Sequence, residues 1–342
     1  MANSTKSYAE SYLSPQGPGD ARPTALQIVE DNKLLGTWKG RVALVTGGTS
    51  GIGVETVRAL HATGADVWFT ARDASKGQAI LEDLSKNSRG EGLLQVLAMD
   101  LDSLESVREA ADAFLKKSSK LHILINNAGI MATPYSKTKE GFERQLAVNH
   151  LAHYLLTTLL LPTLKSSSTA GQSSRVINLS STGHRLSTFH FDDYNFEKPG
   201  SYEPFTAYGQ SKTANAWTAN YIDRVFGPQG VRAFSVHPGA IASGIQAFCD
   251  PALMKQLLED PEGSKAWQTA QQGAATSVWA AVAIELEGQG GKYLSQCSVA
   301  GPAKTLSPAE FDPGYAPHLY DQEAEERLWK LSASLLHIEN GY

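Results

Sequence analysis

The stretch that decides the fold is Val42-Ala43-Leu44-Val45-Thr46-Gly47-Gly48-Thr49-Ser50-Gly51-Ile52-Gly53. Its first four residues are apolar throughout, which is the pattern of a parallel β-strand covered on both faces. The glycine-rich turn leads into an amphipathic helical stretch that ends near Gly64. Glycine suits such a turn because it adopts unusual dihedrals and lets a pyrophosphate approach the backbone. The stretch therefore predicts a dinucleotide site with its phosphates at the start of the helix.

The alternation of strand and helix continues along the chain. Apolar runs predict further strands at 65–70, 93–99, 121–125, 175–179, 231–236 and 292–294, and periodic stretches predict helices at 75–86, 104–116, 141–164, 207–226 and 271–286. Alternating units of this size imply a doubly wound parallel sheet of the Rossmann type, in the α/β class. We expect one dinucleotide-binding catalytic domain over 39–300. A partly irregular extension at 1–38, either wrapped on the domain or loose, and a second extension at 301–342 flank it.

Composition excludes several other classes of protein. The 342 residues carry a formal net charge of -5 and no basic cluster, so we expect no nucleic-acid partner. The most apolar stretch, 151–164, is too short and too polar to span a bilayer, and the N-terminus lacks the apolar core of a signal peptide. Cys249 and Cys297 lie far apart without a metal-binding pattern. These features predict a cytoplasmic protein without a bound metal.

The end of the second strand indicates which dinucleotide binds. In dinucleotide folds this position faces the adenosine ribose, where an acidic residue favours the free 2′-hydroxyl and a basic residue favours a 2′-phosphate. Arg72 stands there and predicts NADP(H), because a guanidinium suits bidentate phosphate contact. Asp73 follows immediately. A shift of one residue in register would therefore make NAD(H) the cofactor.

Tyr208 and Lys212 predict an acid–base pair. Four residues apart in a helical stretch, they lie on one helix face. A lysine ammonium near a phenol favours the phenolate, so we expect a lowered tyrosine pKa and proton exchange with a substrate oxygen. The same spacing also occurs at Tyr135-Lys139 and Tyr194-Lys198. Proline and glycine beside those two pairs predict loops, which leaves the pair at 208 and 212.

Taken together, the motifs resemble the short-chain dehydrogenase/reductase family over about 39–294. They occur in the family's order: TGGTSGIG at 46–53, Asp100-Leu101, NNAG at 126–129, Asn149, Ser180-Ser181, Tyr208-x-x-x-Lys212 and Pro238-Gly239. Within the family the chain is similar to the retinol dehydrogenase and WW-domain oxidoreductase branch, including its fungal members. The stretches TARD, AVNHLAHYLLT and GGKYLSQC carry that likeness.

The resemblance implies a role for each motif. Tyr208 is the proton donor and acceptor, and Ser181 binds the substrate oxygen, with Ser180 as the alternative. Lys212 also binds the nicotinamide ribose, and Asn149 anchors a water in a proton relay. A serine, Ser243, stands where the family usually has a threonine that contacts the nicotinamide carboxamide. The expected cofactor-binding residues are Gly47, Thr49, Ser50, Gly51, Ile52, Gly53, Arg72, Asp100, Leu101, Asn127, Ala128, Gly129, Tyr208, Lys212, Pro238, Gly239, Ile241 and Ser243.

Two segments bear on the substrate. The segment after Gly239 normally closes over the substrate in this fold, and its apolar residues predict a bulky lipophilic ligand. Packing of a helix would also explain its residues Met254, Leu257 and Leu258. The insert between Ser181 and Tyr208 carries several aromatic residues, which line the substrate entrance or pack as a plain loop.

We therefore predict an enzyme that transfers hydride between NADP(H) and a lipophilic ketone or alcohol, acting as a ketoreductase on a terpenoid, polyketide or steroid-like secondary metabolite. The alternatives are a catalytically silent NADP(H)-binding regulator and the same scaffold used for non-redox chemistry. In the family, the helix that bears the tyrosine often joins a homodimer interface. Leu328, Leu331, Leu335 and Leu336 have helical spacing and would cap that surface in a monomer.

Overall fold

The computed structural model describes residues 8–306 and 312–338; residues 1–7, 307–311 and 339–342 of the two extensions lie outside the described residues. Its core is an eight-stranded sheet in the order β3-β2-β1-β4-β5-β6-β9-β10. Among the described strands, the neighbours pair in parallel except β9 and β10, which pair antiparallel. The predicted doubly wound parallel sheet is confirmed. Its strands are β1 (Val42–Val45), β2 (Asp66–Ala71), β3 (Leu94–Ala98), β4 (Ile123–Asn126), β5 (Ser174–Leu179), β6 (Val231–His237), β9 (Lys292–Ser295) and β10 (Ser298–Val299).

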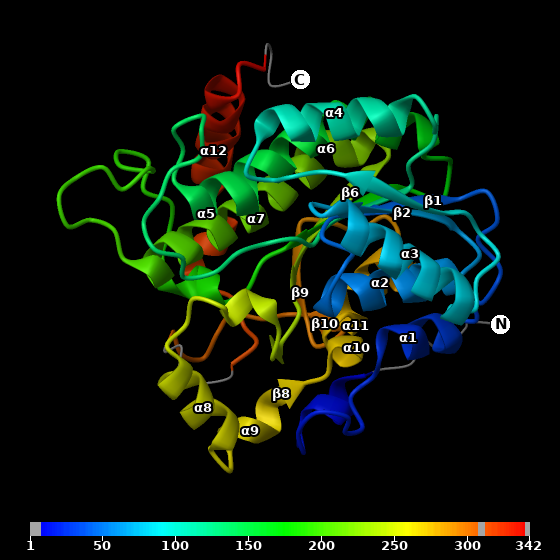
Figure 1. Cartoon of the computed structure of the whole chain (residues 1–342), viewed down its shortest axis with the longest axis horizontal. Helices are drawn as coiled ribbons and strands as arrows, with labels where there is room; N and C mark the ends of the chain where they lie inside the picture. The colour runs from blue at the N-terminus through cyan, green and yellow to red at the C-terminus, as the bar shows by residue number, and fades with distance from the viewer. Residues whose placement is uncertain (1–7, 307–311, 339–342) are drawn as a thin grey trace.

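Helices cover both faces of the sheet (Figure 1). Strand β1 shows why its residues are all apolar: Leu44 joins one buried cluster with Phe114 and Trp217, and Val45 joins the opposite cluster with Leu60. The first face carries α4 (Leu104–Leu115), α6 (Ala152–Ser167) and α7 (Pro204–Phe226). The second carries α2 (Gly51–Ala62), α3 (Ala74–Asn87) and α11 (Ala275–Val282).

Two predicted helices are interrupted in the structure. The helix predicted at 141–164 begins only at Arg144, where Glu143 accepts hydrogen bonds from the first N–H groups of α5 (Arg144–Leu146). It then passes through a π-helical segment, Ala147–Leu151, before α6. The helix predicted at 271–286 is divided into α10 (Ala270–Gly273), α11 and a 3-10 turn. Although α6 is strongly apolar, no helix within the described ranges has the length and apolarity needed to cross a membrane.

Both terminal extensions are packed against the sheet domain. Helix α1 (Ala25–Asp31) buries Ile28 and Val29 completely, in contact with α11 and α2. Over 25–31 the N-terminal extension is regular: Thr24 caps a helix whose apolar residues reach the core, so this part of it is wrapped on the domain and not loose. At the other end, α12 (Gln322–Leu335) packs along α7. The helical leucine spacing in the C-terminal extension is confirmed, with Leu328 and Leu336 buried.

Candidate active site

Most of the predicted site motifs follow the carboxyl end of a strand. The glycine turn follows β1, Arg72 follows β2, Asp100 comes just after β3, and NNAG begins at the last residue of β4. Parallel strands bring these ends to one edge of the sheet. The chain order reverses there between β1 and β4, and ligands of open α/β sheets bind at such a point. The same edge receives Ser180-Ser181 from β5 and Pro238-Gly239 from β6.

The backbone of the glycine turn leaves no room for side chains. Gly47 and Gly51 have positive φ angles of 67° and 53°. A Cβ on Gly53 would lie 2.1 Å from the carbonyl oxygen of Gly47. Ser50 precedes α2 without a side-chain cap, so the first N–H groups of the helix receive no bond from it. Uncapped N–H groups beside an open glycine backbone suit a phosphate, and the turn therefore fits a dinucleotide.

A buried threonine that sequence reasoning did not single out joins this turn to NNAG. The Thr46 hydroxyl accepts the backbone N–H groups of Asn127 and Ala128 at 2.9 and 3.0 Å. The Asn127 side chain in turn donates to the Thr46 carbonyl at 2.8 Å. These bonds fix the two neighbouring loops against each other. The signal available in the sequence was a single hydroxyl residue between an apolar strand and the first glycine.

Arg72 and Asp73 lie at the same strand end but differ in their contacts. The Asp73 carboxylate accepts the Lys76 N–H at 3.0 Å and the Ser75 hydroxyl at 2.6 Å, and so caps α3. Hydrogen bonds from Ser75 and Lys76 hold the pKa of Asp73 below its usual value. The Arg72 side chain is exposed. Asp73 is thus engaged in helix capping, whereas the Arg72 guanidinium is accessible to a ligand.

The structure brings Tyr208, Ser181 and Lys212 together. Glu203 caps α7 five residues before Tyr208, and Pro204 occupies the first turn. Tyr208 is buried, and Lys212 Nζ lies 5.5 Å from the centre of its ring. The ring and the Ser181 hydroxyl both border Gly183, where a Cβ would lie 2.7 Å from Tyr208 Cε1 and 3.4 Å from Ser181 Oγ. Ser180 points elsewhere, because its hydroxyl donates to the Lys212 carbonyl at 2.8 Å. Ser181 is therefore the serine that faces the tyrosine.

Burial dominates the electrostatics of this group. It raises the pKa of Tyr208 to about 12, although the neighbouring Ser181 side chain acts in the opposite direction. It also lowers the pKa of Lys212 to about 8, because an ammonium loses its hydration in the site. Burial of the phenol thus has a larger effect on the pKa of Tyr208 than the groups that lower it, and the lowered pKa expected from Lys212 is not seen in this structure.

Lys212 and Asn149 meet beside Gly129. Lys212 Nζ donates to the Leu179 carbonyl at 3.0 Å. Asn149 lies in the π-helical segment, accepts the Ile130 N–H at 2.8 Å and donates to the Ser211 hydroxyl at 2.9 Å. A Cβ on Gly129 would lie 3.1 Å from the Asn149 oxygen and 3.4 Å from Lys212 Nζ. The absence of a side chain at 129 thus keeps these groups adjacent.

The histidines near the site have structural contacts. His153 bonds the Thr46 hydroxyl at 2.9 Å and the Asn149 carbonyl at 3.0 Å, and the His237 ring accepts the Thr182 N–H at 3.3 Å. Burial lowers the pKa of His153 to about 4, and those of His150, His184 and His237 to about 3. These rings stay neutral at pH 7 and hold neighbouring loops in place.

The remaining residues expected to contact the cofactor or the substrate lie on two segments, of which one is largely exposed and the other is packed. Ala240–Ile241 forms strand β7, which pairs with β8 (Trp267–Gln268). Ser243 begins a capping box with Gln246, so its side chain shapes the turn after β7. Between these strands, residues 242–266 form what we call the lid, which includes α8 (Pro251–Glu259) and α9 (Gly263–Ala266). Its apolar side chains are largely exposed, with Leu257 at 38% and Leu258 at 42%.

The exposed fraction of the side chains distinguishes between the alternatives that the sequence left open for the lid and for the aromatic insert. Helix packing does not account for Leu257 and Leu258, because neither is buried against the rest of the chain. The aromatic insert behaves in the opposite way. Phe189 and Phe196 are buried, and Phe191 stacks with Trp217 of α7. This part of the insert is a packed loop.

The model of the family described as short chain dehydrogenase matches residues 41–252. The chain belongs to the short-chain dehydrogenase/reductase family. It is 46% identical over 334 residues to the short-chain dehydrogenase/reductase prx1 of Penicillium rubens, covering 97% of this chain and 95% of the relative. It is 38% identical over 299 residues to retinol dehydrogenase 12 of Bos taurus, covering 87% of each chain.

Among solved structures, the Pseudomonas aeruginosa RhlG/NADP active-site complex aligns with a TM-score of 0.60 at 26% identity, covering 77% of this chain and 96% of that chain. These relatives place the chain in the retinol dehydrogenase-like branch, as the sequence predicted. The family consists of oxidoreductases that act on alcohol and carbonyl groups with nicotinamide cofactors.

Proposed function

We propose that this protein is an NADP(H)-dependent ketoreductase whose proton donor is Tyr208. The observation that carries the proposal is the buried Tyr208, with Ser181 and Lys212 beside its ring, at the sheet edge that holds the glycine turn. A bound nicotinamide would supply or accept the hydride. The first turn of α2 and Arg72 would hold its phosphates, and Asn149 and Gly129 border the space beside Lys212.

The side chains divide the proton chemistry among them. The Ser181 hydroxyl holds the carbonyl oxygen of the substrate in line with the Tyr208 hydroxyl. Tyr208 is neutral well above pH 7, so its O–H is available for donation to that oxygen as negative charge develops. The Lys212 ammonium, protonated below about pH 8, then stabilises the phenolate that remains.

Replacing Tyr208 tests this assignment. Tyr208→Phe removes only the hydroxyl, so the NADPH dissociation constant is expected to stay within about threefold of wild type while kcat for a lipophilic ketone falls by roughly 10²–10⁴, the contribution of a positioned acid. Binding is followed by nicotinamide fluorescence and turnover by absorbance. Full turnover in Tyr208→Phe would disprove the mechanism. Cofactor binding without consumption by the wild type would favour a silent regulator or non-redox chemistry.

The choice of NADP(H) rests on Arg72. Its accessible guanidinium suits a 2′-phosphate, and the neighbouring carboxylate of Asp73 caps α3 and does not serve a ribose hydroxyl. We expect Arg72→Ala to weaken NADPH binding by about tenfold or more, the value of a charge-assisted contact, and to leave NADH binding nearly unchanged. Lys76→Ala, also on the exposed start of α3, is the control. Equal losses for both cofactors would contradict the assignment.

The substrate we propose is a bulky lipophilic ketone or alcohol, such as a terpenoid, polyketide or steroid-like metabolite. The exposed Phe248, Leu257 and Leu258 of the lid support this, because they offer apolar surface that the chain itself leaves uncovered. One relative bears the name of a retinol dehydrogenase, and retinol is a lipophilic alcohol.

We further propose that the chain acts as a monomer and not as the homodimer that the family often forms. Helix α12 occupies the surface of α6 and α7: Trp329 stacks on Tyr221 at 4.4 Å and meets Tyr154 at 4.6 Å between ring centres. Sedimentation equilibrium of the full chain tests the proposal, and a concentration-independent dimer mass would contradict it.

A further inference from the structure

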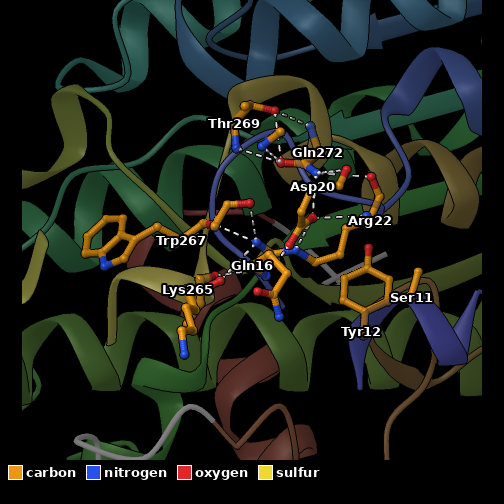
Figure 2. A network of polar contacts seen from close by, with 12 residues as sticks. Ser11, Tyr12, Gln16, Asp20, Arg22, Lys265, Trp267, Thr269 and Gln272 are labelled. Atoms are coloured by element: carbon orange, nitrogen blue, oxygen red, sulfur yellow. Dashed lines mark hydrogen bonds and ion pairs between the residues drawn. The ribbon is translucent and has the colours of Figure 1, made fainter. Parts of the chain in front are cut away.

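Residues 16–22 of the N-terminal extension form a strap that reaches the far end of the lid. Its Arg22 side chain is 3% exposed and bridges about 245 positions of sequence. Nη1 donates to the Ala266 carbonyl at 2.9 Å, and Nη2 donates to the carbonyls of Lys265 at 3.1 Å and Trp267 at 2.6 Å. One guanidinium thus holds three consecutive carbonyls where α9 ends (Figure 2).

The charge of Arg22 is balanced within the strap. Nε donates to Asp20 Oδ1 at 2.8 Å, and the third bond of Nη2 goes to the Gly17 carbonyl at 3.1 Å. Asp20 also accepts the backbone N–H of Gln16 at 2.8 Å. All three nitrogens of the guanidinium donate to these partners, and a buried arginine is tolerated when its charge is paired and hydrogen-bonded in this way.

Gln272 ties the strap to the chain on the other side of β8. Its amide nitrogen donates to Asp20 Oδ1 at 3.0 Å and to the Arg22 carbonyl at 3.1 Å. Its amide oxygen accepts the N–H of Gly19 at 2.9 Å and that of Thr269 at 3.1 Å. In Figure 2, Asp20 lies between Gln272 and Arg22. Strand β8 is therefore held by the strap at both of its ends.

The anchored strand lies against the cofactor side of the site. Strand β8 pairs with β7, directly after Pro238-Gly239. Gln268 fills the space at Gly239, where a Cβ would lie 1.9 Å from its amide nitrogen. On α10, a Cβ at Gly273 would lie 2.5 Å from Ile241 and 3.3 Å from Ile52. A displacement of β8 would thus reach residues expected to contact the dinucleotide.

The two ends of the lid are held by different means. At its start, Gln246 donates to the Ile241 carbonyl at 2.7 Å, a bond within the same segment. Between the ends, the described side chains of α8 are exposed except for the half-buried Met254, so the helix gains little from packing. At its return, the strap supplies the bonds through Arg22. The position of the lid relative to the glycine turn therefore depends on a residue from the N-terminal extension.

We propose that Arg22 is a positioning residue, whose guanidinium holds the lid at 265–267 in the place required for closure over cofactor and lipophilic substrate. The inference rests on the proposed function for what the lid closes over, and on the contacts above for the anchoring itself. Arg22 touches neither the expected cofactor residues nor Tyr208. It acts through β8, β7 and α10.

Trypsin reports on the anchor independently of activity, because Lys265 itself supplies one of the held carbonyls. In Arg22→Ala, cleavage after Lys265 is expected to accelerate by at least about tenfold, since local opening no longer breaks charge-assisted bonds. The NADPH dissociation constant and the ketone KM are expected to rise severalfold, with a smaller change in kcat. Arg22→Lys keeps the positive charge but not the planar, forked guanidinium. Its cleavage rate after Lys265 should lie between those of the wild type and Arg22→Ala.

Arg175→Ala is the matched control. Arg175 is equally buried, donates to the Ala280 carbonyl at 3.0 Å and pairs with Glu287 at 3.1 Å, away from the lid. Faster cleavage after Lys265 in the Arg22 variants, but not in Arg175→Ala at equal loss of melting temperature, supports the proposal. Equal cleavage in both would overturn it. If Arg22→Ala does not fold, the Arg22→Lys rate decides in the same way. Failure of the proposed ketoreductase activity would leave the cleavage result standing.

Discussion

The two terminal segments are attached to the same domain by different physical means. The C-terminal helix α12 lies on α6 and α7 through aromatic rings, with Trp329 between Tyr221 and Tyr154. The N-terminal segment uses an apolar helix, α1, for the core and a polar strap for the lid, through Arg22 and three backbone carbonyls. Figure 1 shows α12 near α4 and α6, and the N-terminal segment close to β8 and α10.

The difference follows from what each segment supports. Helix α7 carries Tyr208 and is a fixed part of the fold, so a large apolar contact suits its outer surface. The lid has few buried side chains, so directional bonds at its base define its position without burying it. We therefore expect damage to the C-terminal contact to appear mainly as lost stability, and damage to the strap to appear mainly at the lid.

The largest expected effect comes from Trp329→Ala. The side chain is 3% exposed and meets three aromatic rings, so its loss leaves a cavity and should lower the free energy of unfolding by about 3–5 kcal/mol. Chemical denaturation measures this, with exposed Lys330→Ala of the same helix as the control. Tryptic cleavage after Lys265 should stay at the wild-type rate under native conditions. A loss of unfolding free energy below about 1 kcal/mol would contradict the conclusion that α12 is attached mainly by its aromatic contacts.

A smaller loss is expected from Ile28→Ala in α1. Ile28 is fully buried between α1 and the sheet domain, and removing three carbon atoms from such a site costs about 2–4 kcal/mol. Leu35→Ala, at a residue 43% exposed on the same segment, should stay within about 0.5 kcal/mol of wild type. The strap carries no part of this apolar contact, so cofactor affinity should be unchanged at temperatures where the variant is folded. A coupled loss of affinity would show that α1 and the strap act as one unit.

The smallest effect concerns pH. His150 bonds Ser332 of α12 at 2.8 Å, and burial together with the nearby His153 lowers its pKa to about 3. The unfolded chain binds this proton near pH 6.5 and the folded chain does not, so stability falls as pH drops below 6.5, by about 1.4 kcal/mol per unit from this residue. His150→Gln should flatten the denaturation profile between pH 6.5 and 5 by that slope. If the slope of stability against pH is unchanged in His150→Gln, His150 is not a source of this pH dependence.

The contacts of the strap should not change when the pH is lowered from 6.5 to 5. Burial opposes ionisation of Asp20, but its hydrogen bonds from Arg22 and Gln16 are stronger and lower its pKa below the usual value, so Asp20 stays charged. Hydrogen-exchange protection factors, which are corrected for the intrinsic pH dependence of exchange, should therefore fall more in α12 than at 265–267 when the pH is lowered from 7 to 5. A parallel fall in both segments would contradict this distinction.

The sequence by itself determined the doubly wound sheet, and it predicted that the site motifs lie at one edge of it. Periodic apolar runs and a glycine turn are local signals, and the carboxyl ends of parallel strands must meet at one edge. The order of motifs was sufficient to recognise the family, and helix context was sufficient to choose Tyr208 over Tyr135 and Tyr194. These inferences needed only short spacings along the chain.

Tertiary structure alone decided the remaining features. The raised pKa of Tyr208 and the lowered pKa of Lys212 both depend on burial, which no spacing along the sequence reveals. Asp73 is a helix cap because α3 begins at Ala74, a boundary that the sequence alone did not place. Arg22 stands in a stretch without periodicity, and its partners lie about 245 residues away. Hydrogen bonds from one side chain to distant backbone carbonyls leave no pattern in a single sequence, because every residue has a carbonyl to offer.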